Sequence, residues 1–466
     1  MSQKAFNSPC DLSAKRSLGT NTKSSTPPLS GSTTNRVQQT RAERYRLQNS
    51  ARDLLLWKGQ TKGLEYPANF HRTAKCLHVR TGDNVGVHLS NEHNKAFMSG
   101  LSICGSVWSC PVCAAKIQER RRIEIAQGFD WAYANNKKMI MVTFTIPHYA
   151  NQRLDELITK MREAFSGLRA GKPWANITKR VGYRGLIRSL EITIGENGWH
   201  PHTHEAWIVD KDTDTEALRD RVAARWLTMC ERAGIVAKSS EAAFLARSVN
   251  IMDNCSTSDY LAKQDDSRNW GIDRELASAS SKKSRSVKGF HPFGLLAEHA
   301  EGGEGRKDAG ARFIEYATTM RDKRCRQIFW SHGLKKLVGL EDKQDEQLAE
   351  EQTDKADMLG LLDSEQWRLI IKHQSKSDVL DAAENGGWGA VMTLIANLKS
   401  RTPAPAHEPI LAPAPTPEPP APACHLLSLD AYLSASVGDR SASLSRCAKP
   451  SPAQALIDRF QRPNSA

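Results

Sequence analysis

The chain has 466 residues, and its 39% hydrophobic content can support more than one folded core. Lysine and arginine outnumber aspartate and glutamate by 65 to 52, and the net charge of +13 favours a polyanionic partner such as nucleic acid. The sequence opens with no basic-then-apolar leader, and no apolar run approaches the roughly 18 residues that span a bilayer, so we expect a cytoplasmic protein without a membrane partner.

Composition and periodicity divide the chain into six parts. Serine, threonine and asparagine dominate its start, whereas proline–alanine pairs and then serines dominate its end. Between them, short β-like runs alternate with helical ones, which predicts an α+β fold. We expect a disordered basic tail, a cysteine-rich zinc module with a basic helix, an α+β domain, a small helical module, a Pro/Ala-rich linker and a flexible tail, at residues 1–45, 46–135, 136–340, 341–400, 401–424 and 425–466.

Cysteines in the second part have metal-ligand spacing. A Cys-Pro-x-Cys turn at residues 110–113 aims two thiolates at one ion, and a third cysteine lies shortly before it. Four free buried thiols are the alternative interpretation. The predicted ligands of a structural Zn²⁺ are Cys76, Cys104, Cys110 and Cys113, with His71 or His78 as substitutes for the first.

The segment 114–134 is predicted to be helical and carries Arg120, Arg121 and Arg122 in succession. These guanidinium groups could contact DNA phosphates, or they could form a solvated helix face, which is the commoner fate of a charge run.

Two strands and a helix are predicted in the α+β part. Residues 139–146 are rich in β-branched and aromatic residues and stop at Pro147, and residues 186–194 form a second strand-like run. Residues 215–233 place apolar side chains at four-residue steps, as in an amphipathic helix that covers a sheet.

A hairpin follows the second strand. Asn197-Gly198 is a strong signal for a type I′ turn, in which both central residues have positive φ. A two-residue loop at these positions places Glu191 opposite His204, and a four-residue loop places it opposite His202.

Because side chains alternate along a strand, His200, His202 and His204 share one face. Together with Glu191, the last two make a two-nitrogen, one-oxygen site suited to Mg²⁺ or Mn²⁺ with open positions for a phosphate oxygen. Solvated polar histidines are the alternative interpretation. His200 lies nearest the turn and is a spare ligand, a DNA contact or a surface residue.

A helix is expected to begin near Ser256, with serine and aspartate available as caps, and to place Tyr260 and Lys263 on one face. A tyrosine hydroxyl is a weak nucleophile that needs a polarised electrophile and nearby positive charge, which Lys263 could supply. Tyr316 competes for this role but has no lysine three residues later.

These motifs resemble those of the HUH endonuclease superfamily, and within it the plasmid rolling-circle replication initiators, or Rep proteins. His202-Thr203-His204 is similar to the two-histidine motif, and Tyr260-Leu-Ala-Lys263 is similar to the tyrosine helix that follows it. The run at 107–117 with its arginines resembles the N-terminal Rep signature, and runs at 290–296, 312–317 and 328–334 resemble its C-terminal part.

The resemblance implies an antiparallel-sheet nuclease domain with flanking helices, in which His202, His204 and Glu191 hold the metal. It implies that Tyr260 attacks a phosphate of origin DNA, giving a 5′-phosphotyrosyl link and a free 3′-OH that primes replication by a host helicase, DNA polymerase and single-strand binding protein. Some relatives have a glutamate one turn before the tyrosine for termination. Position 256 is serine, which leaves Asp259 or a second protomer of a homodimer for that step.

Two other functions remain open at this point. A transposase could use the same chemistry, and the catalytic residues do not distinguish it from a replication initiator. A zinc-containing DNA-binding regulator with structural histidines would bind a specific sequence without nicking it.

Overall fold

The structure, a computed structural model, describes residues 33–56, 71–260, 291–302, 305–350 and 356–401. Lys263 and the expected linker and C-terminal tail beyond residue 401 lie outside the described residues. No helix within these ranges is both long and apolar enough to cross a membrane.

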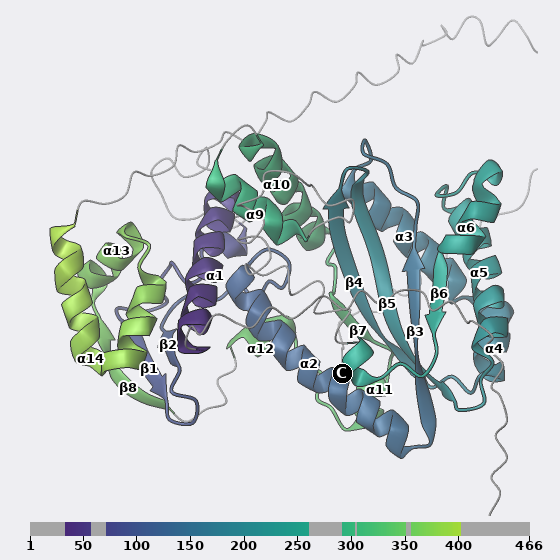
Figure 1. Cartoon of the computed structure of the whole chain (residues 1–466), viewed down its shortest axis with the longest axis horizontal. Helices are drawn as coiled ribbons and strands as arrows, with labels where there is room; N and C mark the ends of the chain where they lie inside the picture. Colours follow the sequence, from purple (N-terminus) through teal and green to yellow (C-terminus); the bar gives the residue numbers. More distant parts are fainter. Residues whose placement is uncertain (1–32, 57–70, 261–290, 303–304, 351–355, 402–466) are drawn as a thin grey trace, which may run out of the picture. The chain divides into compact units, whose positions relative to one another are not determined.

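A five-stranded antiparallel sheet forms the centre of the larger part, in the strand order β6-β3-β5-β4-β7 (Figure 1). The expectation of an α+β fold with an antiparallel sheet is therefore confirmed. Both predicted strands are present, with ends within two residues of the expected ones. The strands are β3 (Lys137–Thr145), β4 (Gly185–Gly195), β5 (Gly198–Asp210), β6 (Val249–Met252) and β7 (Ile328–Trp330).

Helices cover one face of this sheet almost completely. Phe144 of β3, Phe165 and Trp226 lie within 5.3 Å of one another, measured between ring centroids, and the last belongs to the predicted amphipathic helix. Burying large aromatic side chains supplies much of the hydrophobic stabilisation of such a core. The helices on this side are α3 (Leu154–Leu168), α4 (Gly171–Arg180), α5 (Thr215–Arg232) and α6 (Glu241–Arg247), and α10 (Arg306–Asp322) contributes to the same core.

The opposite face is covered at one end only. The basic helix α2 (Pro111–Ala134) packs Ile125 and Phe129 against Met141 of β3 and Ile208 of β5, and α11 (Leu334–Val338) extends this layer. Further along β5, the same face carries polar side chains instead of apolar ones. The candidate site lies there.

A second sheet joins two parts of the chain that the sequence analysis treats separately. Its order is β2-β1-β8, from strands β1 (Val85–Ser90), β2 (Ala96–Ser99) and β8 (Ala356–Leu362). Residues 341–400 are therefore not purely helical, because β8 pairs with a strand of the cysteine-rich part. Pairing between segments so distant in sequence leaves no local signal. The helices α13 (Ser364–Lys372) and α14 (Lys376–Ser400) complete this second core, and α12 (Asp345–Glu350) precedes it.

Part of the segment expected to be a disordered tail is helical in the structure. Helix α1 (Thr33–Leu55) begins inside the range 1–45, and Arg41 pairs with Asp381 of α14 at 2.8 Å as well as with Glu384. These long-range ion pairs fix a segment whose composition alone favours disorder. Helix α9 (Pro292–Glu301) packs against α1 and α10.

The second core predicts a stability effect. Ile370 of α13 is fully buried, so Ile370→Ala should lower the free energy of unfolding by about 2–5 kcal/mol, because it leaves a cavity. Leu361→Ala on β8 is the control, since that side chain is 50% exposed and its loss should cost less than about 0.5 kcal/mol. Urea denaturation of both variants checks this, and equal losses would contradict the assignment of this core.

Candidate active site

The hairpin that carries the histidines differs in its turn from the prediction. Gly195 pairs with Gly198, so Glu196 and Asn197 form the two-residue loop. Only Gly198 has a positive φ, of +83°, which corrects the type I′ prediction. A type I turn followed by a glycine in the left-handed region is the other common hairpin connection. A Cβ at this glycine would lie 3.0 Å from the backbone of Tyr149.

This turn sets the register of the two strands. Glu191 lies opposite His202, which is one of the two registers expected from the sequence. Its Oε2 lies 3.1 Å from Nε2 of His202 and 3.4 Å from Nε2 of His204. One potential ligand atom from each of the three side chains falls within 4.8 Å of the others. The predicted carboxylate and two imidazoles therefore converge on one point.

Hydrogen bonds at the Nδ1 atoms orient the imidazole rings of His202 and His204. Nδ1 of His204 lies 2.9 Å from Oγ1 of Thr143 on β3, and Nδ1 of His202 lies 3.3 Å from the carbonyl oxygen of His200. Both Nε2 atoms consequently face Glu191. Burial acts to raise the pKa of Glu191, but hydrogen bonds from the two histidines outweigh it and hold that pKa well below its usual range. An ionised carboxylate beside two imidazole nitrogens is a suitable donor set for a divalent cation.

His200 lies on the same face of the sheet as Glu191, His202 and His204, but it is not part of the cluster that these three side chains form. Its ring lies 4.8 Å from that of His202 and 4.4 Å from that of His148, which follows β3. Burial and the neighbouring histidines lower the pKa of His200 to about 3, which favours its neutral form. Neither Thr143 nor His148 was predicted, because Thr143 lies on β3 and His148 follows it, far from the histidine hairpin in the sequence.

Tyr260 lies on the same face of the sheet as the cluster. Residues 257–260 are helical, and the predicted caps are present: Ser256 Oγ accepts from the backbone N–H of Asp259, whose carboxylate accepts from the N–H of Ser256. The Tyr260 side chain is fully buried, and its hydroxyl lies 3.3 Å from the carbonyl oxygens of His204 and Ile187. The phenol therefore contacts the backbone of a candidate ligand and is closed off from solvent.

The competing tyrosine lies on the other face. Tyr316 of α10 is fully buried and packs against Trp199, Trp108 and Phe313 in the large core. Burial raises the pKa of its hydroxyl well above the usual value. The sheet thus separates Tyr316 from the Glu191 cluster.

The four predicted cysteines form a second cluster, and all are buried. The Sγ atoms of Cys76 and Cys113 are 3.5 Å apart, those of Cys104 and Cys113 are 3.7 Å apart, and those of Cys110 and Cys76 are 3.8 Å apart. Four sulfurs around Zn²⁺ with bonds of about 2.3 Å would be separated by about 3.8 Å, so the cluster fits this ion. Hydrogen bonds from the other thiols hold the pKa of Cys110 well below its usual value.

A hydrogen-bonded chain connects this cysteine cluster with α14. The amide Nε2 of Gln48 donates to the carbonyl oxygen of Cys76 at 3.0 Å and lies 3.8 Å from the sulfur of Cys110. Its Oε1 accepts from the buried ammonium of Lys376 at 2.7 Å. A cation close to a set of thiolates offsets their charge. His71 and His78 lie outside the four-cysteine cluster.

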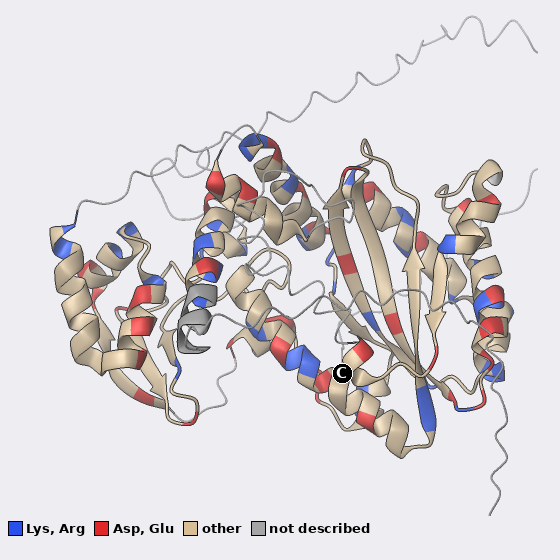
Figure 2. Ribbon diagram, in the orientation of Figure 1, with Lys and Arg blue, Asp and Glu red and all other residues tan. Residues whose placement is uncertain are grey.

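The predicted DNA-contacting arginines of α2 lie among acidic residues, as the adjacent blue and red bands of α2 in Figure 2 show. Arg121 is only 11% exposed and pairs with Glu124 and Asp345 at 2.8 and 2.7 Å. Arg122 is exposed and lies 3.4 Å from Glu119. Arg121 is therefore engaged within the protein itself.

Comparisons with known proteins agree with the sequence resemblance. Residues 97–239 match the family described as a replication protein. A protein from Streptomyces lividans named "Protein rep" is 26% identical over 306 residues, which cover 52% of this chain and 65% of that protein. A "Neomycin resistance protein" from Streptomyces cyanogenus is 35% identical over 155 residues, which cover 26% of this chain and 34% of that protein. No solved structure matches significantly.

The matched parts leave a third or more of each relative uncovered, and the family match includes the histidine pair and three of the cluster cysteines. The predicted resemblance to plasmid replication initiators is confirmed by the family match and the Streptomyces lividans relative.

The bond between Thr143 and His204 gives a test of the metal site. Thr143→Val removes the hydroxyl that orients the imidazole, and losing such an outer partner should weaken divalent-metal binding by about 10–100-fold. Thr145→Val, on the same strand and face, removes a hydroxyl that bonds to the carbonyl of Arg247 and should leave the affinity unchanged. Calorimetric titration with Mn²⁺ checks both variants, and equal affinities would argue against this orientation.

The cysteine cluster predicts bound zinc that stabilises the fold. Cys110→Ser should lower the zinc content measured by atomic emission and also the melting temperature, because it removes one of four ligands. Cys230→Ser is the control, since this buried free cysteine lies in α5, away from the cluster. A purified wild-type protein without zinc would contradict the prediction.

Proposed function

We propose that this chain, as a relative of plasmid replication initiators, is a rolling-circle initiator that nicks one strand at its origin and becomes covalently linked to the 5′ end. The fold would then be that of an HUH endonuclease, preceded by a zinc-stabilised module. The protein would work in the cytoplasm, where its DNA and the replication machinery are found.

One observation carries this proposal: the carboxylate of Glu191 and the imidazoles of His202 and His204 converge on the sheet face against which Tyr260 packs. A divalent cation such as Mg²⁺ or Mn²⁺ bound by these three side chains would polarise a phosphate oxygen and leave coordination positions for it. A regulator that only binds DNA has no need for a phenol beside such a cluster.

The reaction transfers a phosphoryl group between two oxygens. The Tyr260 oxygen attacks the scissile phosphorus and loses its proton, a P–O bond to the tyrosine forms, and the P–O3′ bond breaks. The 3′ oxygen leaves and takes up a proton, giving the 3′-OH that a host DNA polymerase extends. Before attack, the Tyr260 hydroxyl must leave the carbonyl oxygens of His204 and Ile187, so residues 257–260 have to shift when DNA binds.

Other residues have supporting roles in this proposal. Lys263 would stabilise negative charge on the phosphoryl oxygens. Arg120 and Arg122 would contact DNA phosphates, and Arg121 would do so after its ion pairs open. His200 would be a spare ligand or a DNA contact. Host helicase and single-strand binding protein would act with the polymerase, and Asp259 or a second protomer of a homodimer would serve termination.

The decisive experiment tests the nucleophile. Full-length protein is incubated with labelled origin oligonucleotide and Mg²⁺ or Mn²⁺, and the covalent adduct is resolved on a denaturing gel and mapped by mass spectrometry. Tyr260→Phe should abolish the adduct, because it removes the attacking oxygen. Tyr149→Phe is the matched control, because this tyrosine is 62% exposed and should leave the adduct yield unchanged.

Each failure has a distinct meaning. An adduct that persists in Tyr260→Phe would reject this nucleophile. Sequence-specific binding without any adduct, with either metal, would favour a non-catalytic regulator. A gene that lies between transposon ends, instead of beside a double-strand origin on a small plasmid, would indicate a transposase with the same chemistry.

A further inference from the structure

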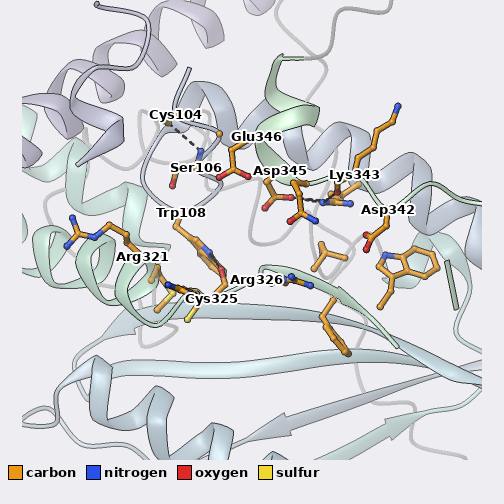
Figure 3. A pocket seen from close by; sticks show the side chains of 18 of the residues that line it. Cys104, Ser106, Trp108, Arg321, Cys325, Arg326, Asp342, Lys343, Asp345 and Glu346 are labelled. Carbon is orange, nitrogen blue, oxygen red and sulfur yellow. Dashed lines mark hydrogen bonds and ion pairs between the residues drawn. The ribbon is translucent and has the colours of Figure 1, made fainter. Parts of the chain in front are cut away.

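A cavity of about 650 Å³ lies beside β7, the edge strand next to β4 (Figure 3). Its wall includes β7, the segment that follows α10, the loop around Cys104 and residues 342–346. Figure 3 shows Asp345 and Glu346 on one side of the cavity, and Arg321, Cys325 and Arg326 on the other. We call it the β7 pocket. None of the candidate ligands of the Glu191 cluster lines it.

Acidic side chains of this pocket are already neutralised. Asp345 pairs with Arg121 at 2.7 Å, Glu346 pairs with Arg72 at 2.8 Å, and Asp342 lies 3.3 Å from Lys335. None of these cations comes from the segment between α10 and β7. The acidic side of the pocket therefore does not cancel the charge of the opposite side.

Two cations on that opposite side remain available. Arg324 and Arg326 are exposed, and within the described part of the chain their guanidinium groups make no ion pair or hydrogen bond. Arg321, which is also exposed, pairs with its neighbour Asp322 at 2.7 Å. Exposed guanidinium groups suit the bidentate recognition of phosphate. The charge of the pocket thus favours a polyanion.

The strand pairing connects this pocket with the Glu191 cluster. Ser189 of β4 pairs with Ile328 of β7, and the N–H of Leu190 donates to the carbonyl of Gln327 at 2.8 Å. Gln327 therefore lies beside Leu190, the chain neighbour of Glu191, and Arg326 directly precedes Gln327 in the sequence. The available cations thus belong to the segment that leads up to this point of the edge strand.

The pocket also contains a hydrogen-bond donor without an acceptor. Trp330 lines it with only 9% of its surface exposed, and among the described residues its indole N–H has no partner. Buried tryptophan nitrogens usually find an acceptor. A ligand rich in oxygen acceptors would supply one.

From these observations we propose that the β7 pocket binds the backbone of the single DNA strand that runs from the scissile phosphate, with Arg326 and then Arg324 holding successive phosphates. This inference rests on the proposed function, because the DNA strand would enter the β7 pocket from the Glu191 cluster. It assigns the strand's path to the segment between α10 and β7, which the sequence did not single out.

The test measures binding of a short single-stranded oligonucleotide of mixed sequence to the full chain, by fluorescence anisotropy at several salt concentrations without added Mg²⁺. For single strands, the slope of log K against log salt changes by about 0.7 for each phosphate contact. Arg326→Gln should lower it by about 0.7, and Arg324→Gln with Arg326→Gln by about 1.4. Arg326→Lys, which keeps the charge, should restore most of the slope.

Arg368→Gln is the matched control, because it removes the same charge from an exposed position on α13 and should leave the slope unchanged. An unchanged slope in the double variant would overturn the proposal. So would a loss confined to duplex DNA, or a loss of poly-glutamate binding alone, which would assign the pocket to an acidic protein segment.

The covalent-adduct assay on the same proteins separates the two proposals. If the wild-type protein forms no adduct, the proposed endonuclease function is rejected, whatever the slopes of the binding measurements are. If the wild-type protein forms an adduct and the variants keep unchanged slopes, only the proposed DNA binding by the β7 pocket is rejected.

Discussion

The turn at Glu196–Asn197 fixes the register in which β4 pairs with β5, and this pairing places Glu191 opposite His202. A carboxylate and two imidazoles come together here because they lie at matching positions of neighbouring strands. Shifting the register by one residue would move Glu191 to the apolar face and bury an unpaired charge among aromatic rings. The left-handed backbone of Gly198 is therefore part of the site, although it contributes no functional group.

The same register organises the covered face. Beyond the two histidines, β5 turns Glu205 and Trp207 to the other side, where Glu205 is fully buried. Its carboxylate pairs with Arg169 and accepts from the indole N–H of Trp207 at 2.8 Å. A buried charge is tolerated when it is paired and hydrogen-bonded in this way. One strand thus serves a polar cluster on one face and an ion pair inside a core on the other.

Local periodicity in the sequence predicted much of this architecture. The strand expected at 139–146, the helix expected at 215–233 and the shared face of the histidines follow from repeats of two and 3.6 residues, which any single segment displays. Residue chemistry identified the four cysteines, because thiols at turn spacing have few other uses.

What depends on distant partners was not predictable. Thr143, which orients His204, and His148, whose ring contacts that of His200, reach the site only through the pairing of β3 with β5. The strand β8 was not predicted, because the segment around it has a helical pattern and its partner β1 lies far away in the sequence. The turn was displaced by one position because glycine also serves hairpins as the residue that follows a type I turn.

The pairing of β1 with β8 has a consequence for the order of folding during synthesis. Strands β3 to β6 all leave the ribosome before residue 253, whereas β1 stays without one neighbour until residues 356–362 have been made. The five-stranded sheet can therefore begin to assemble while the sheet that contains β1 is still incomplete. The hydrogen-bonded chain from Cys76 through Gln48 to Lys376 closes later still, so the surroundings of the four thiols are complete only near the end of translation.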